Sequence, residues 1–490
     1  MKTTAMKMTN FNFKLSIYAA LLALSGIAPS AYAEETNEVV EDYTLLDAIK
    51  QGKSLSSVRA RYETVEQEGF QSATATAPKL DNAYAFTTRT LIGWQTAPFK
   101  NFSFAAQITD VHEFNDDFND RRDNLPEHNN GTASSNAFKR QFPNIVDPGF
   151  TDINQLFVDW TGIKNTKLRL GRQIINLDNV RFVGDIAFRQ NTQVFDGISV
   201  INKSIPKTEI FASHFTKVRQ VNTKLRDGNI SLFNAKYRWT PTESLTGYAY
   251  LVDVANLSQN NGNPAAVSTA AQGGNGLGAS DDLVKTATTD ASSKTFGVRL
   301  DGVHIFNPTW KGLYTAEYAK QDDYRGGNSA IDAHYLKIGG GAAYNAWSIR
   351  LDHEVLSSND GKYAFQTPLG TNHLFQGWAD HFLATPRQGI KDTFVTVSGA
   401  IDKLKIYSEF HVFKSDENYE TLGSTPASRR FGDKYGTEFD LGLTYPINDN
   451  VWAKLEYAKF NESDVYGTTL AAVPRKADKE IVWLTAQYSF

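Results

Sequence analysis

The sequence predicts an all-β protein, a single antiparallel β-barrel of about eighteen strands that spans a membrane. Three observations predict this fold. Apolar and polar residues alternate with the strand period of two in most segments after residue 55. Most of these segments run for about 10–14 residues, longer than the ~5–6 of globular strands and enough for the ~9–11 of a tilted membrane strand. The connections between them alternate between short and long.

Composition and charge exclude several other classes of protein. The chain has 490 residues, no cysteine and a formal net charge of −4. Without cysteine there is no disulfide scaffold, cysteine–zinc site or thiol nucleophile. Without a basic excess there is no global field for nucleic-acid binding. After the first 33 residues no run of about 20 apolar residues appears, which excludes a bundle of membrane helices.

Residues 1–33 have the features of a secretory signal peptide. Three lysines precede a short apolar stretch over 15–27, and Ala31-Tyr32-Ala33 is a small-x-small cleavage site. The apolar stretch is too short to serve as a permanent anchor. We expect cleavage after Ala33, which removes the three lysines and brings the net charge of the mature chain to −4 − 3 = −7. The product is then periplasmic, outer-membrane or secreted.

Residues 34–54 form a periplasmic leader, and the barrel takes up residues 55–490. Within the leader, residues 43–50 have helical spacing and Gly52 is a stop signal. Two alternatives stay open for this segment: a short helix at the periplasmic mouth, or a loosely ordered lead into the first strand.

The strands follow one another along the whole barrel. In 404–412, Leu, Ile, Ser, Phe and Val fall on one face and Lys, Tyr, Glu and His on the other. In the last segment every second residue, counted back from Phe490, is apolar or aromatic. The eighteen segments begin near residues 55, 83, 102, 152, 166, 193, 208, 230, 245, 293, 309, 333, 347, 390, 404, 435, 451 and 480.

The connections assign the two ends of the barrel. Turn-forming Asn, Asp, Gly and Pro occupy the short links 162–165, 240–243, 307–308, 345–346 and 447–450. Long polar stretches lie at 115–151, 178–192, 258–292, 358–389, 417–434 and 464–479. Short periplasmic turns and long extracellular loops are typical of outer-membrane barrels. An even number of strands places both termini on the short-turn side, and we expect 258–292 and 358–389 to face outside.

A soluble β-sandwich or a solenoid is the alternative fold. Either would also alternate, but neither needs strands this long or an aromatic residue such as Phe490 at the end of the last strand. No repeat of about 20–50 residues is visible, which weakens the solenoid. We therefore favour the barrel.

Alternation also predicts what the lumen carries. A charge that faces lipid costs ~2–4 kcal/mol at the midplane, so charged strand residues are expected to point inward. Seven inward acids include Glu63, Asp159 and Glu354, against eleven inward bases. One alternative is that these charges pair across strands, with Arg59–Glu63 and Lys454–Glu456 as local candidates. Otherwise the excess of 11 − 7 = 4 bases selects for anions. The pore-lining candidates on the strands are Arg59, Arg61, Arg89, Lys167, Arg169, Lys236, Arg238, Arg299 and Arg350.

We expect neither a cofactor nor a metal. The Asp-rich stretch 110–130 offers oxygen ligands of the kind Ca²⁺ takes, but it lacks the spacing of a known calcium loop. The nine histidines show no metal-ligand spacing, and no nucleophile elbow or catalytic triad motif stands out. The sequence therefore does not predict an enzyme.

The residues between 168 and 197 resemble a known family. Leu-Arg-Leu-Gly-Arg-Gln at 168–173 leads through Arg181 and Arg189-Gln190-Asn191 to Phe-Asp-Gly at 195–197. This resembles the bacterial alginate-export outer-membrane family, in which a Gly-Arg-Gln strand end leads through an arginine-bearing loop to a Phe-Asp-Gly strand start. The resemblance is strongest over residues 55–200 and continues by pattern to 490.

The resemblance implies an eighteen-stranded barrel with an arginine-lined constriction that conducts polyuronate. Arg169, Arg172, Arg181 and Arg189 are the positions carried over. Arg172 has the lipid-facing parity of its strand, which requires a place at the rim or after a bulge. For the two loop arginines the alternative is pairing with a nearby aspartate that only orders the loop. Those aspartates are Asp178, Asp185 and Asp196.

The predicted function is a passive outer-membrane channel for an anionic, alginate-like polysaccharide or oligosaccharide. An uptake porin for small carboxylates or oligouronates on the same architecture is the second hypothesis, and a barrel enzyme or surface adhesin is the third. An adhesin should carry its aromatic residues in long loops, whereas most of them here lie on strands. The expected partners are outer-membrane lipid, the anionic solute and periplasmic export or uptake proteins.

Overall fold

The protein is described from a computed structural model. It covers residues 43–68, 80–120, 142–255, 257, 290–421, 430–463, 469–470, 473–474 and 478–490. The predicted signal peptide lies outside these residues. Within them, no helix has the length and apolar character needed to cross a membrane.

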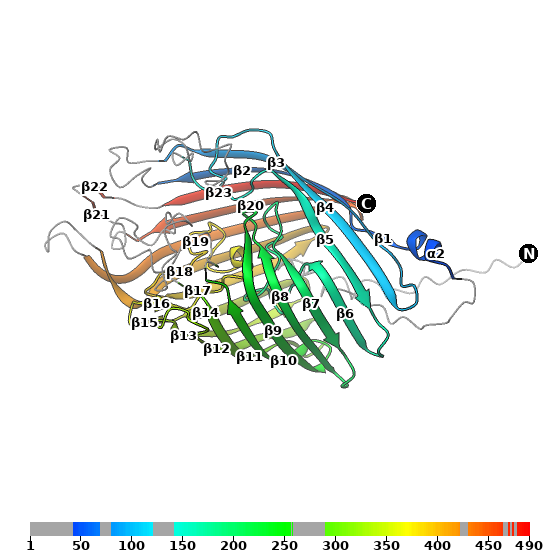
Figure 1. Cartoon of the computed structure of the whole chain (residues 1–490). Helices are drawn as coiled ribbons and strands as arrows, with labels where there is room; N and C mark the ends of the chain where they lie inside the picture. The colour runs from blue at the N-terminus through cyan, green and yellow to red at the C-terminus, as the bar shows by residue number, and fades with distance from the viewer. Residues whose placement is uncertain are drawn as a thin grey trace, which may run out of the picture.

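Eighteen antiparallel strands form a closed barrel, as the sequence predicted. Each pairs with its neighbours in chain order (Figure 1). The predicted starts at 230 and 435 fall farthest from the observed ones, Leu225 and Arg430. The strands are β2 (Ser57–Gln67), β3 (Ala83–Gln95), β4 (Phe102–Glu113), β5 (Phe150–Trp160), β6 (Thr166–Gln173), β7 (Val194–Asn202), β8 (Thr208–Arg219), β9 (Leu225–Thr240), β10 (Glu243–Asp253), β11 (Ser293–Ile305), β12 (Trp310–Asp323), β13 (Asp332–Tyr344), β14 (Trp347–Leu356), β17 (Ile390–Ile401), β18 (Leu404–Thr421), β19 (Arg430–Pro446), β20 (Val451–Glu462) and β23 (Lys479–Ser489).

The barrel closes between its first and last strands. β2 and β23 pair from Ser57 opposite Ser489 to Gln67 opposite Lys479. The N–H of Phe490 then donates to the carbonyl oxygen of Ser56 at 3.1 Å. Closure satisfies the backbone groups of both edge strands, which a bilayer interior cannot do.

A short helix lies at the end of the barrel where the C-terminus also emerges (Figure 1). α2 (Leu45–Lys50) begins with a capping box, in which Thr44 and Asp47 each cap the other's backbone N–H. The indole N–H of Trp94 on β3 donates to the carbonyl oxygen of Ile49 at 2.8 Å, which ties the helix to the barrel. Of the two alternatives for residues 43–50, the helix is the one that forms. β1 (Lys53–Ser54) follows it and pairs with β3.

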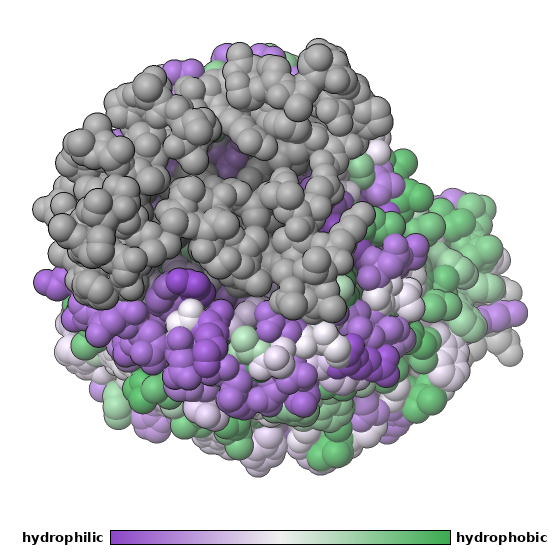
Figure 2. Space-filling view, turned by 60° about the vertical axis from the view of Figure 1, so that its left-hand side comes forward, coloured by the Kyte–Doolittle hydropathy of each residue, from purple (hydrophilic) through white to green (hydrophobic). Residues whose placement is uncertain are grey.

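The wall separates an apolar outer row from a polar inner row. On β2, Val58 and Tyr62 are exposed on the outside, while Arg59, Arg61 and Glu63 are buried on the inside. Figure 2 shows hydrophilic residues gathered at the forward rim and hydrophobic residues farther along the wall. An apolar band of this kind faces lipid. The remaining short elements are β15 (Ser358–Asn359), β16 (Tyr363–Ala364), η6 (Asn372–Leu374), β21 (Thr469–Leu470) and β22 (Val473–Pro474).

Candidate pore constriction

Two long connections fold into the barrel and contact each other there. Residues 174–193 join β6 to β7, and residues 357–389 join β14 to β17. Val183 and Leu369 form a parallel bridge. The N–H of Gly184 donates to the carbonyl oxygen of Leu369, and the N–H of Thr371 to that of Val180, both at 2.9 Å. We call these two segments the inner connections.

The connection 358–389, expected as a long polar loop at the outer end of the barrel, carries buried apolar side chains and folds inward. Phe365, Leu369, Trp378 and Phe382 are all at most 5 % exposed. Phe365 packs near Tyr335 of β13, with ring centroids 5.8 Å apart. These apolar side chains favour the interior over water, which turns the connection inward. The other predicted outside loop, 258–292, lies almost entirely outside the described residues.

Arg189 ties the first inner connection to the wall and to the second. Its guanidinium lies 3.1 Å from a carboxylate oxygen of Glu63 on β2, 3.7 Å from Asp147 and 2.8 Å from Asp380. The side chain of His373 in turn lies 2.8 Å from Asp380. Burial alone would raise the pKa of the Asp380 carboxyl, but His373 and Arg189 outweigh it and lower that pKa to about 2. Asp380 is therefore charged at neutral pH.

Arg181 makes a second network of the same kind. Its Nε–H donates to Glu354 on β14 at 2.7 Å. Its two Nη groups donate to Asn372 at 3.1 Å, Gln376 at 2.8 Å and Thr367 at 3.3 Å. Both loop arginines therefore order the inner connections, but through different partners from the three nearby aspartates that sequence spacing suggested. Local spacing could not indicate the observed partner of Arg181, because Glu354 lies 173 residues away in the sequence.

Three arginines gather on the wall beneath the first inner connection. Arg59 and Arg89 lie directly opposite each other on β2 and β3, and Arg61 follows on the same inner row. Arg59 donates to the carbonyl oxygens of Ala187 at 2.9 Å, Phe188 at 3.3 Å and Arg189 at 3.4 Å.

The other two members of this group use neutral acceptors as well. Arg61 donates to the carbonyl oxygen of Phe188 at 2.6 Å, and Arg89 to Gln487 at 3.3 Å. Among the described residues, none of the three forms an ion pair with a carboxylate. The Nε atoms of Arg59 and Arg89 are buried without a hydrogen-bond partner. We call Arg59, Arg61 and Arg89 the arginine cluster.

Most other predicted pore-lining bases are neutralised by carboxylates. The shortest contacts are Arg169–Asp159 at 2.6 Å, Lys236–Asp178 at 2.7 Å, Arg299–Asp301 at 2.9 Å and Arg350–Asp352 at 2.8 Å. Of the two local pairs suggested by sequence, Lys454–Glu456 forms at 2.5 Å. The pair Arg59–Glu63 does not form, because Arg189 takes Glu63.

The remaining candidates are more exposed than the arginine cluster. Lys167 is half-buried on β6, and Arg238 is exposed near the end of β9. Arg172 has outward parity, as expected, and stays on that side without a bulge in β6. Its charge is balanced by Asp196 at 2.8 Å and Asp152 at 3.0 Å.

Sequence reasoning missed the aromatic residues of the constriction. The ring of Phe188 stacks on His373 at 3.3 Å between centroids, and Trp483 meets both rings edge-on at 5.6 Å. Trp378 stacks on Tyr407 at 5.6 Å. For Phe188, His373 and Trp378, the signal that could have found them is the run of aromatic residues inside connections otherwise taken as polar.

A closed barrel with an apolar outer row and a charged lumen narrowed by inner connections defines an outer-membrane transport channel rather than an enzyme. A family model described as alginate export matches residues 56–379. The chain belongs to this family and resides in the bacterial outer membrane. No curated protein matches the chain significantly.

Solved structures of similar fold are outer-membrane proteins. Pseudomonas aeruginosa OccK9 (OpdG) has a TM-score of 0.59 at 11% identity, over 90% of this chain and 99% of that one. Pseudomonas aeruginosa OpdK, solved with vanillate, has a TM-score of 0.57 at 12% identity, over 90% and 98%. Acinetobacter baumannii OccAB3 has a TM-score of 0.59 at 10% identity, over 90% and 100%. At such identities the likeness concerns the fold alone.

Proposed function

We propose that the protein is a passive channel that conducts an anionic polysaccharide or oligosaccharide, alginate-like, through the arginine cluster. The observation that carries this proposal is the like-charge pair of Arg59 and Arg89, which has no carboxylate partner among the described residues. Like charges directly opposite each other destabilise a sheet. An anion beside them relieves that repulsion.

The chemistry of the guanidinium group fits a carboxylate sugar. Its planar fork binds a carboxylate through two parallel hydrogen bonds, which an ammonium group cannot do. Arg59 and Arg89 each retain a buried Nε–H with no acceptor. A uronate carboxylate supplies the missing acceptor together with the missing negative charge.

Most other bases in the lumen form ion pairs with carboxylates, so the proposed binding site is the arginine cluster. Bases such as Arg169, Arg299 and Arg350 have carboxylates within 3 Å, so they attract a passing anion less than isolated charges do. The arginine cluster lies under residues 187–189 of the first inner connection, to which Arg59 donates. A polymer reaches it only when that connection moves.

An uptake porin for small carboxylates or oligouronates is the second candidate. The observation that favours it is the pair of inner connections, joined by the Val183–Leu369 bridge, because segments inside the lumen leave less room for a polymer than for a small solute. OpdK, a protein of similar fold, was solved with vanillate, which is itself a carboxylate. Both candidates need the arginine cluster, and they differ in whether the inner connections open for a polymer.

Planar-bilayer recording with the folded protein tests the proposal. The reversal potential in a salt gradient is expected to show anion preference, and oligouronates are expected to block the current at lower concentration than neutral oligosaccharides of equal length. Block that strengthens with oligouronate length supports the polymer. Permeation of single uronates without length dependence supports the uptake porin. Cation preference contradicts both.

A further inference from the structure

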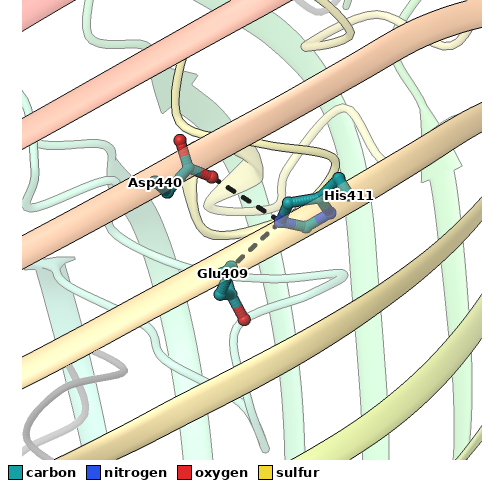
Figure 3. A group of neighbouring side chains, drawn as sticks. All are labelled: Glu409, His411 and Asp440. Carbon is teal, nitrogen blue, oxygen red and sulfur yellow. Dashed lines mark ion pairs between the residues drawn. The ribbon is translucent and has the colours of Figure 1, made fainter.

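A second group of charged side chains lies on the inner face of β18 and β19, which β20 and β23 separate from β2. In the pairing of β18 and β19, Glu409 lies opposite Asp440 (Figure 3). His411 lies opposite Glu438 in the same pairing. All four are at most 5 % exposed. None of them takes part in the arginine cluster or in the networks of Arg181 and Arg189.

The distances from His411 to each of two neighbouring carboxylates match those between ligand atoms bound to the same metal ion. Nε2 of His411 lies 3.6 Å from Oε2 of Glu409 and 3.6 Å from Oδ2 of Asp440. These separations are too long for hydrogen bonds. They are close to the ~3–3.5 Å between two ligand atoms that each lie about 2.0–2.2 Å from a shared ion. One ligand atom from each of the three residues lies within 4.8 Å of the others.

Buried polar atoms in this group have no partner. Nε2 of His411, Oδ1 of Asp440 and Oε2 of Glu438 are all buried without a hydrogen bond. Burying several carboxylates around one imidazole is unfavourable unless something neutralises them. Nε2 of His411 faces one carboxylate oxygen each of Glu409 and Asp440 at ion-pair distance (Figure 3), and a cation among these three atoms would satisfy all of them.

Surrounding residues hold the ligands in place. Nδ1 of His411 lies 2.9 Å from a carboxylate oxygen of Asp392 on β17, which turns Nε2 toward Glu409 and Asp440. A carboxylate on the second ring nitrogen is the usual support of a metal-binding histidine. Oε1 of Glu409 accepts from the hydroxyls of Tyr407 and Thr396, both at 2.7 Å, which turns Oε2 toward the site.

We propose that Glu409, His411 and Asp440 bind one divalent transition-metal ion of the Zn²⁺ or Mn²⁺ class. An imidazole nitrogen with two carboxylates suits these ions, whereas Ca²⁺ and Mg²⁺ prefer oxygen ligands throughout. The N–H of Trp378 donates to Asp440 at 3.3 Å, and that of Ala379 to Glu438 at 2.5 Å. The second inner connection therefore rests on the proposed site, and the bound ion stabilises its attachment to the wall.

Titration calorimetry on the full folded chain tests the site. The protein is prepared without a histidine tag, stripped with chelator, dialysed and titrated with ZnCl₂, MnCl₂ and CaCl₂. We expect one equivalent of Zn²⁺ or Mn²⁺ and at least tenfold weaker binding of Ca²⁺. Asp440→Asn and His411→Gln should each weaken transition-metal binding at least tenfold. His353→Gln is the matched control, because His353 bonds Thr393 outside the site.

The proposal would be overturned by an absence of stoichiometric binding, by equal affinity in the parent and both site variants, or by preference for Ca²⁺. Folding of each variant is checked by its heat-modifiable mobility in a gel. If His411→Gln does not fold, the metal affinity of Asp440→Asn is the test, because the amide side chain has the same shape as the carboxylate it replaces. The parent is also loaded with Co²⁺, and the absence of visible absorption bands from a nitrogen-ligated ion would overturn the proposal without any variant.

Discussion

Arg59 of β2 and Arg89 of β3 lie directly opposite each other on the inner wall, and in the described part of the chain neither is paired with a carboxylate. Elsewhere in the lumen, arginines such as Arg169 and Arg299 each have an acid within 3 Å. A like-charge pair costs stability. Its occurrence amid so many balanced charges makes it the first place to test for solute binding.

Removing this like-charge pair should weaken anion preference. In Arg59→Gln/Arg89→Gln two charges are lost, each worth about 0.7 kcal/mol to an anion ~6 Å away in water. Together they correspond to about tenfold in the affinity of a blocking oligouronate. We expect the reversal potential to shift toward cation preference, most strongly in dilute salt, where screening is weakest.

Lys403→Gln serves as the control for that variant, since Lys403 is exposed in the turn between β17 and β18. It should leave selectivity and block unchanged. An unchanged reversal potential in the double variant would contradict the role of the arginine cluster.

Replacing Arg189 should release the inner connections. In Arg189→Met the carboxylates of Glu63, Asp147 and Asp380 lose their shared cation, and breaking a buried pair typically costs ~3–5 kcal/mol. We expect larger, noisier single-channel currents and faster proteolysis within 174–193, while the barrel keeps its heat-modifiable mobility. Arg238→Met, which alters an exposed arginine, should behave like the parent. Currents as quiet as those of the parent would show that Arg189 does not hold the constriction.

Acid should loosen the same contact. The pKa of Asp380 is lowered from 3.8 to about 2, so its ionised form stabilises the folded state above about pH 4. This contribution, about 2 kcal/mol, is lost as the pH falls from about 4 to 2. Current noise should therefore rise over that range. Asp380→Asn should be noisy already at neutral pH and insensitive to this change. Noise that rises equally in the variant would assign the transition to another group.

The barrel should insert only when its last strand is intact. Deleting residues 480–490 removes nearly all of β23 and leaves β2 and β20 with unpaired edges. Open edges are not tolerated in a bilayer. We expect no heat-modifiable, membrane-inserted protein from this truncation, whereas deletion of 34–42 should insert normally. Insertion of the truncated chain would count against closure through β23.

Export should remove the first 33 residues. The small residues at Ala31 and Ala33 suit signal peptidase, so the mature protein should begin at Glu34. The intact mass of protein purified from outer membranes checks this. A mass that includes the first 33 residues would instead indicate a retained anchor.

The sequence by itself determined the barrel, because the evidence for a barrel is local. Period-two alternation is set by the geometry of a single strand, and connection lengths are read directly along the chain. Both features can be read from the sequence without knowing which residues each strand contacts. The same parity placed Arg59, Arg61 and Glu63 on the inner face and Arg172 on the outer one.

Only the tertiary structure decided which charges meet. Glu63 pairs with Arg189, 126 residues away, rather than with Arg59 on its own strand. His411 and Glu409 share a face by spacing, but Asp440 joins them through the register of β18 against β19. The path of 357–389 into the lumen likewise depends on the apolar surface it finds there. Charge pairing and loop packing are contacts between residues distant in sequence, so no local period encodes them.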